Sequence, residues 1–276
     1  MWTIHCCGWK VNGRCALKTL STLVRLGKGA APLRFSTFVH GDLPLDWHEE
    51  FTSTVVFPEL AGIELNLITP SDKLYYASER ELPDLFNHSL PWWGFLWPGG
   101  HSLTQFILDE KVSRKFIRGK QVLDFGSGCG VSAIAALKFG GARSVQVCDI
   151  DHLSLHAAHI NAVQNGVVEE GAGPDSMMTF TDSNVIGSSI ENIDVLIAGD
   201  VLYDDTLADE LFPWFQYLSN ELGKTVIFGD PDRWVLKRMG SEERMKKFKR
   251  LATFEFPEHY RETNHGITEG NVYIVQ

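Results

Sequence analysis

The stretch that decides the fold is Asp124-Phe125-Gly126-Ser127-Gly128-Cys129-Gly130. It begins in an apolar segment at 121–125 that we predict as a strand, and it leads into an apolar segment at 131–139 that we predict as a helix. Glycines at such a junction permit a tight turn and a close approach of the backbone to a ligand. The first turn of the helix also offers unpaired N–H groups to a carboxylate or a phosphate. The junction therefore predicts a ligand-binding loop.

The spacing of the glycines separates three classes of ligand. A dinucleotide fingerprint needs G-x-G-x-x-G, and counting from Gly126 the last position is Val131. A P-loop needs Lys followed by Ser or Thr, and neither follows the glycines here. The remaining pattern, acid-x-G-x-G-x-G, is typical of S-adenosylmethionine binding. We therefore predict S-adenosylmethionine as cofactor, with S-adenosylhomocysteine as product, held by Asp124, Gly126, Ser127 and Gly128.

Strands and helices alternate on both sides of this loop from residue 119 onward. The predicted strands are 121–125, 144–149, 178–181, 194–199, 225–229, 253–256 and 271–275. The predicted helices are 131–139, 153–165, 207–222 and 235–249. Apolar strands separated by amphipathic helices indicate a doubly wound, mostly parallel sheet. We predict an α/β fold with a seven-stranded Rossmann-like class I methyltransferase sheet over 119–276, whose last two strands form a hairpin at one edge.

Residues 42–118 follow a different pattern. The segment 63–69 alternates apolar and polar residues until Pro70, which is the periodicity of a strand. We expect 74–77 to pair with it, so that an antiparallel appendage precedes the main sheet. The other expected elements are a short helix or loop at 42–57, an ordered aromatic loop at 91–100 and a helix at 103–108.

The amino-terminal segment differs in charge from the rest of the chain. Residues 1–41 contain six basic and no acidic residues, whereas the remainder carries 19 basic and 35 acidic residues, a net charge of −16. An acid-free, basic, hydroxyl-bearing leader is typical of a mitochondrial transit peptide. We expect residues 1–35 to be that peptide and the mature protein to reside in the mitochondrial matrix. A disordered basic tail without targeting function is the alternative.

The composition excludes several classes of protein. With 44% apolar and 22% charged residues the chain has the composition of a globular domain rather than of a disordered one. No run reaches the roughly 18 apolar residues that a membrane-spanning helix needs. The acidic body disfavours nucleic acid as a partner, since phosphate contacts need Lys and Arg. We expect a monomer that binds neither membrane nor nucleic acid.

Two polar positions follow the second and third predicted strands. The carboxylate of Asp149 can accept hydrogen bonds from both hydroxyls of a ribose. NAD enzymes also place an acid there, and the cap of the next helix is a further alternative. Asn184 follows the strand 178–181 and is placed to meet an adenine amino group, although an Asx turn is equally consistent with its position.

A third segment, Gly199-Asp200-Val201-Leu202-Tyr203, follows the fourth predicted strand. In a doubly wound sheet, ligands bind beyond the carboxyl ends of the strands. Methyltransferases that act on adenine bases usually carry a D/N-P-P-Y/F/W tetrad here, and the absence of prolines argues against a base substrate. We predict Asp200 and Tyr203 as catalytic residues, with Asp200 also beside the cofactor; capping of the next turn is the alternative for Asp200.

The glycine loop, the segment Trp97-Pro98-Gly99-Gly100 and the motif Asp200-x-x-Tyr203 together resemble the family-16 protein methyltransferases. The resemblance spans roughly 63–231. It implies successive transfer of methyl groups from S-adenosylmethionine to lysine ε-amines, up to trimethyllysine. Within the family it resembles members that modify the electron transfer flavoprotein β subunit, where methylation would tune electron transfer from dehydrogenases. It also implies that Trp97 packs beside the cofactor.

The chemistry implied by the resemblance requires a lysine that attacks as the free amine, although its reference pKa is about 10.4. An aromatic channel would lower that pKa by desolvation and would bind the cation through its rings. Trp92, Trp93, Trp97 and Tyr203 are candidates for this channel, and core packing is the alternative for the tryptophans. Asp200 is a candidate acceptor for the amine. Another protein substrate, or a noncatalytic scaffold, remains an alternative function.

Three charged groups complete the predictions. The acidic residues Asp204, Asp205, Asp209 and Glu210 either steer a cationic substrate or form a solvated helix start. We expect the basic run 244–250 to be a solvated helix face. His152, His156 and His159 share one side of the helix 153–165, and we expect an exposed polar face there and no metal site.

Overall fold

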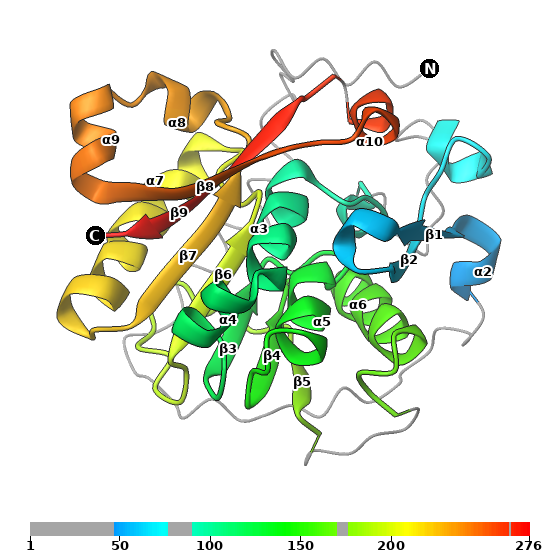
Figure 1. The fold of residues 1–276 in the computed structure, drawn as a ribbon, viewed down its shortest axis with the longest axis horizontal. Coiled ribbons are helices and arrows are strands. Elements are labelled where there is room, and N and C mark those ends of the chain that lie inside the picture. Colours follow the sequence, from blue (N-terminus) through cyan, green and yellow to red (C-terminus); the bar gives the residue numbers. More distant parts are fainter. Residues whose placement is uncertain (1–46, 77–89, 170–175, 265) are drawn as a thin grey trace. The chain divides into compact units, whose positions relative to one another are not determined.

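The computed structural model describes residues 47–76, 90–169, 176–264 and 266–276, so that the predicted leader lies outside the described part. Its main sheet has seven strands in the order β5-β4-β3-β6-β7-β9-β8 (Figure 1). The strands are β3 (Gln121–Phe125), β4 (Ser144–Cys148), β5 (Met178–Thr181), β6 (Val195–Gly199), β7 (Thr225–Asp230), β8 (Phe248–Glu255) and β9 (Glu269–Val275). The first five run parallel, and β9 is antiparallel to both neighbours. This arrangement confirms the predicted class I methyltransferase sheet and its edge hairpin.

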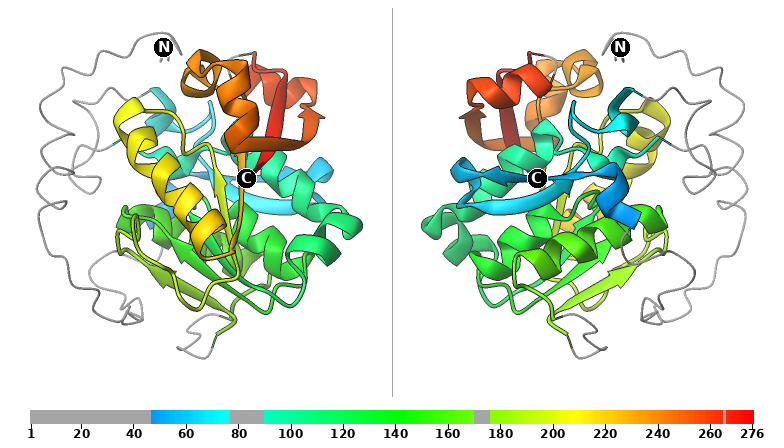
Figure 2. Two further views of the ribbon diagram at one scale, coloured as in Figure 1. Left: turned by 90° about the vertical axis from the view of Figure 1, so that its left-hand side faces the viewer. Right: turned by 90° about the vertical axis from the view of Figure 1, so that its right-hand side faces the viewer.

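Helices cover both faces of the sheet (Figure 1, Figure 2). The helices are α3 (Pro98–Leu108), α4 (Glu110–Phe116), α5 (Val131–Lys138), α6 (His152–Gln164), α7 (Asp205–Gln216), α8 (Trp234–Arg238), α9 (Ser241–Lys247) and α10 (Glu258–Thr263). Neighbouring strand residues such as Leu196 and Ile197 belong to opposite cores, because side chains alternate across a strand. Helices α3, α5 and α6 pack on one face, and α7 and α8 pack on the other. None of the described helices is both long and apolar enough to cross a membrane.

The appendage is an antiparallel hairpin, but the prediction that 74–77 supplies its second strand is wrong. Strand β2 (Ile63–Leu67) pairs with β1 (Ser53–Phe57), and residues 73–76 form a 3-10 helix instead. The hairpin closes locally, because Ala61 and Gly62 both adopt the left-handed backbone region between the two strands. Helix α2 (Trp47–Phe51) precedes it. Ile63, Leu65 and Leu67 are buried in the core that also contains α3 and α5.

The helix predicted at 235–249 is also wrong in part. It is divided into α8 and α9, and strand β8 begins at Phe248, whose ring packs against Phe228 and Phe212 at centroid distances of 5.2 and 5.4 Å. Burial of this aromatic side chain in the core therefore overrides the helical charge pattern. The basic run is correspondingly divided between the end of α9 and the start of β8. Helix α10 within the edge hairpin and the start of α3 at Pro98 were not predicted.

Three glycines bring the start of α3 against the carboxyl ends of β6 and β7. A Cβ atom on Gly229 would overlap the carbonyl oxygen of Gly99, and one on Gly199 would lie 2.7 Å from the Cα of Gly100. A Cβ on Gly99 would lie 2.6 Å from the amide nitrogen of Asp200. Only glycine permits backbones to approach so closely. This contact places the first turn of α3 at the edge of the sheet where ligands of this fold class bind.

We expect Gly229→Ala to lower the free energy of unfolding by about 3 kcal/mol or more, because the new methyl group would overlap backbone that has no free rotamer to adopt. Urea denaturation of the purified protein measures the change. The matched control is Gly240→Ala, because Gly240 is exposed and an added Cβ would meet nothing within 4 Å. Equal stability of the two variants would contradict the proposed close contact.

Candidate functional site

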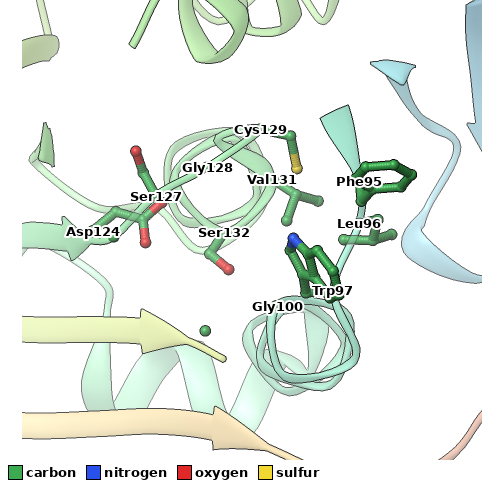
Figure 3. A pocket seen from close by; sticks show the side chains of 12 residues that line it. Phe95, Leu96, Trp97, Gly100, Asp124, Ser127, Gly128, Cys129, Val131 and Ser132 are labelled. Atoms are coloured by element: carbon green, nitrogen blue, oxygen red, sulfur yellow. The ribbon is translucent and has the colours of Figure 1, made fainter. Parts of the chain in front are cut away.

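A pocket lies where β3 ends and α5 and α3 begin (Figure 3). Its empty space is about 330 Å³, including the open mouth. Of the predicted site residues, it brings together Trp97, Asp124, Gly126, Ser127 and Gly128. The remaining lining residues were not among the predicted site residues; they are Phe95, Leu96, Gly100, Cys129, Val131, Ser132 and Gly199. All of these lie within or next to the three segments that carried the resemblance, so proximity to those motifs was the available signal.

The two sides of the pocket differ in chemistry. Figure 3 shows Phe95, Leu96 and Trp97 on one side, and Asp124 and Ser127 on the other. The apolar side comes from the segment that leads into α3, and the polar side comes from the end of β3 and the glycine loop. Such a pocket suits a ligand that has both an apolar or cationic part and a hydrogen-bonding part.

The glycine loop is held by the neighbouring strand. The amides of Gly126 and Ser127 both donate to the carbonyl oxygen of Cys148, at 2.8 and 3.3 Å. Gly126, Gly128 and Gly130 adopt φ values of 63°, 51° and 78°, a backbone region that favours glycine. Within the described part of the chain the buried Oγ of Ser127 has no hydrogen-bond partner. Because buried polar atoms are normally paired, this hydroxyl is a candidate ligand contact.

Asp149 connects the loop to strand β4. Its two carboxylate oxygens accept hydrogen bonds from the amides of Gly128 and Asp151, each at 3.0 Å. The cap of α6 is Asp151, which accepts from the amide of Leu153 at 2.9 Å, so the alternative role of Asp149 as that cap is wrong. The hydroxyl of Ser154 also interacts with this carboxylate. An ionised carboxylate has about four acceptor positions, so acceptor capacity remains for a ligand. Burial raises the pKa of Asp149 to about 6.

Asp124 lies beneath the loop and is 2% exposed. It accepts a hydrogen bond from the amide of Ala133 in the first turn of α5 at 3.1 Å. Burial raises the pKa of Asp124 to about 7, and the nearby Asp149 charge adds to the shift. The ionised form is thus disfavoured, and a bound cation would favour it.

We expect Asp124→Asn to flatten the pH dependence of stability. The folded pKa of Asp124 is raised above its ordinary value of 3.8, so the folded state holds the proton more tightly. The stabilisation of the folded state by this bound proton is therefore lost as pH rises from about 4 to about 7. The free energy of unfolding falls by on the order of 4 kcal/mol at most over this range. The variant removes this decline and leaves those from Asp149, Asp151 and Asp230, whose pKa values are raised by burial as well. Melting temperatures of the unaltered protein and of Asp124→Asn between pH 4.5 and 8 measure how steeply the stability of each declines with pH. An equally steep decline in the two proteins would contradict the expectation.

The carboxylate of Asp200 is engaged within the protein. It is 6% exposed, and its two oxygens accept hydrogen bonds from the amide of Gly99 and from Nε of Arg233. The guanidinium of Arg233 also lies 5.7 Å from the centre of the Trp97 ring. Asp200 adopts a left-handed φ of 59°, which places it at the sharp exit from β6. It therefore joins the start of α3 to the segment after β7.

Asp230 lies beside this ion pair and is fully buried. One of its oxygens accepts from the amide of Arg233 at 2.6 Å, and the other has no hydrogen-bond partner in the described part of the chain. Burial and the nearby charge of Asp200 raise the pKa of Asp230 well above its usual range. Neither Asp230 nor Arg233 was among the predicted site residues, although Asp230 lies within the span of the resemblance.

Aromatic side chains continue from the pocket to the surface. Nε1 of Trp97 donates to the carbonyl oxygen of Trp92 at 2.9 Å, and the two rings lie 5.5 Å apart. The rings of Trp92 and Tyr203 stack at 6.3 Å, and these side chains are 49% and 55% exposed. Trp93 is instead 1% exposed and packs in a cluster with Ile68 and helix α6. The alternative prediction of core packing is therefore correct for Trp93 and wrong for Trp92.

Other predicted residues lie outside the pocket. Asn184 is exposed, and its Oδ1 accepts from the amide of Ile186 at 3.1 Å, which is the Asx turn that the sequence also allowed. Asp204 caps α7 by accepting from Leu207 at 3.0 Å, and Asp205 forms an ion pair with Arg238. These contacts favour the interpretation of Asp204 and Asp205 as the start of helix α7 over a role in steering a cationic substrate.

The histidines of α6 do not form one exposed face. His152 is exposed and pairs with Asp182 at 3.5 Å, but His156 is 2% exposed, so the predicted exposed face is wrong for it. Within the residues that the structure describes, no group of three His, Cys, Asp or Glu side chains is placed to hold a metal ion.

The family model described as ribosomal protein L11 methyltransferase (PrmA) matches residues 98–204. A solved structure of ribosomal protein L11 methylase from Lactobacillus delbrueckii subsp. bulgaricus aligns over 64% of this chain and 79% of that one, with a TM-score of 0.41 and 22% identity.

Longer matches come from curated relatives named electron transfer flavoprotein beta subunit lysine methyltransferase. The protein of Rattus norvegicus is 34% identical over 211 residues, which cover 76% of this chain and 75% of that protein. The protein of Danio rerio is 34% identical over 230 residues, which cover 83% and 80%. With this identity over most of both chains, the protein belongs to the family of the electron transfer flavoprotein beta subunit lysine methyltransferases.

Proposed function

We propose that this protein transfers methyl groups from S-adenosylmethionine to lysines of the electron transfer flavoprotein β subunit, up to trimethyllysine, and thereby modulates electron transfer from dehydrogenases. The observation that carries the proposal is the pocket between the glycine loop and Trp97, which is lined by Ser127, whose buried hydroxyl has no hydrogen-bond partner among the described residues. The names of the curated relatives support the choice of substrate.

The residues of the pocket fit S-adenosylmethionine, which when bound supplies a methyl group on a positively charged sulfur. The first turn of α5 and the hydroxyl of Ser127 would hold its carboxylate. Asp149, which lies next to the pocket at the end of β4, would hold the ribose hydroxyls with its remaining acceptor capacity. The ring of Trp97 and the carboxyl of Asp124 would face the cationic part, since both favour a neighbouring positive charge.

The lysine would reach the pocket over the exposed rings of Trp92 and Tyr203. Aromatic surroundings exclude water and lower the pKa of an amine, so that the uncharged nucleophile becomes accessible near neutral pH. Methyl transfer then needs alignment of the amine with the methyl carbon and sulfur rather than a dedicated base. We assign Tyr203 to contact with the substrate. Asp200 acts by holding the start of α3, because its carboxylate is buried and pairs with the amide of Gly99 and with Arg233.

We further propose that the enzyme works as a monomer in the mitochondrial matrix. The support for the location is the basic, acid-free composition of residues 1–41. A fluorescent protein carrying residues 1–35 would remain outside mitochondria if this part of the proposal were wrong.

The test of activity is transfer of label from S-adenosylmethionine to recombinant electron transfer flavoprotein, with mass spectrometry to identify the modified residues. We expect di- and trimethyllysine on the β subunit. Asp149→Ala should raise the dissociation constant for S-adenosylmethionine by about 10- to 100-fold, because it removes charge-assisted hydrogen bonds. Asn184→Ala is the matched control and should bind as the unaltered protein does, since Asn184 lies in an exposed turn.

The outcomes separate the parts of the proposal. Label on another protein of a mitochondrial extract, with none on the flavoprotein, would keep the chemistry and reject the substrate. Cofactor binding without any labelling would favour the noncatalytic scaffold. Failure to bind S-adenosylmethionine would reject the enzymatic role.

A further inference from the structure

Asn161 of helix α6 connects the glycine loop to the amino-terminal hairpin. Its side chain is completely buried. Nδ2 donates to the carbonyl oxygen of Cys129 at 2.9 Å, and Oδ1 accepts from the amide of Asn66 in strand β2 at 2.8 Å. The orientation of the side-chain amide follows from these partners, because a carbonyl can only accept and an amide N–H can only donate.

The contact with Cys129 fixes a peptide unit of the loop at both ends. Its carbonyl oxygen is held by Asn161, and the N–H of the same peptide, on Gly130, donates to the carbonyl oxygen of Ser127 at 2.9 Å. The flanking residues Gly128 and Gly130 are glycines, which have little intrinsic preference for one backbone conformation. The hydrogen bond from Asn161, which lies outside the loop, therefore contributes strongly to the conformation of the loop.

The hairpin also contacts the opposite side of the pocket. Directly after β2, the amide of Ile68 donates to the carbonyl oxygen of Gly94 at 2.8 Å, and a Cβ on Gly94 would overlap the side chain of Ile68. Gly94 ends the 3-10 helix Trp92–Gly94 and immediately precedes Phe95 of the apolar side. Residues 66–68 thus reach the glycine loop through Asn161 and the aromatic segment directly.

We propose that Asn161 is a positioning residue that sets the conformation of the cofactor loop through its hydrogen bond to Cys129, while its other end holds strand β2. The side chain does not line the pocket, so it acts through the peptide unit that it holds. The identity of the ligand rests on the proposed function, whereas the ordering of the loop does not.

Helix α6 offers a matched control one turn further on. The side chain of Asn165 accepts from the amide of Glu64 at 3.2 Å and donates to its carbonyl oxygen at 2.6 Å. It also donates to the backbone carbonyl oxygen of Asn161 at 2.7 Å. Asn165 therefore joins the same helix to the same strand with no hydrogen bond to the glycine loop among the described residues. Loss of Asn165 weakens the hairpin contact without releasing the carbonyl of Cys129.

The first measurement is amide hydrogen exchange of the full chain without ligand, on peptides that cover 126–131. We expect Asn161→Ala to increase the exchange rate there about tenfold and Asn165→Ala to leave it unchanged. Asn161→Leu keeps about the same volume, buries no charge and has no donor for Cys129, so it should resemble Asn161→Ala and serves if the alanine variant is poorly folded. Equal exchange in the Asn161 and Asn165 variants would overturn the proposal.

The second measurement separates positioning from general loss of structure. Asn161→Ala should raise the dissociation constant and the KM for S-adenosylmethionine about tenfold and leave kcat at saturating cofactor unchanged, whereas Asn165→Ala should change neither. A fall in kcat without a change in KM would overturn the proposal. If the unaltered protein did not bind S-adenosylmethionine, the proposed function would fail, and the exchange measurement would still decide whether Asn161 orders the loop.

Discussion

The site depends on one backbone contact, in which the first turn of α3 meets the ends of β6 and β7 at Gly99, Gly199 and Gly229. No side chain fits between these segments. The carboxylate of Asp200 completes the contact by accepting from the amide of Gly99. Because α3 is fixed in this way, Trp97 faces the glycine loop across the pocket. The Trp-Pro-Gly-Gly segment is thus explained by packing of backbone on backbone.

The two sides of the pocket are supported by residues that contact no ligand. Arg233 binds Asp200 and lies over the ring of Trp97, and it holds the apolar side from the segment after β7. Asn161 holds the polar side from helix α6. Both supporting side chains are distant in sequence from the loop that they serve. A precise site on loops requires such support, because glycine-rich backbone does not define its own conformation.

Local patterns were sufficient for much of the fold and for the core of the site. The glycine spacing, the alternation of strands and helices, and the position of Asp149 after β4 each depend on neighbours in sequence. The errors arose where tertiary contacts decide. Phe248 lies in a strand because its ring is buried against Phe228, although the charges before it suggest a longer helix. Arg233 and Asn161 acquire their roles only from partners more than 30 residues away.

The most direct test of the account is a crystal structure of the protein with S-adenosylhomocysteine. The account predicts the ligand between the glycine loop and Trp97, with both ribose hydroxyls on the carboxylate of Asp149 and the Ser127 hydroxyl within hydrogen-bond distance of the ligand. The side chains of Asp200 and Arg233 should remain paired. A ligand bound elsewhere, or one that leaves Asp149 and Ser127 without contacts, would contradict the assignment of this pocket as the methyl-donor site.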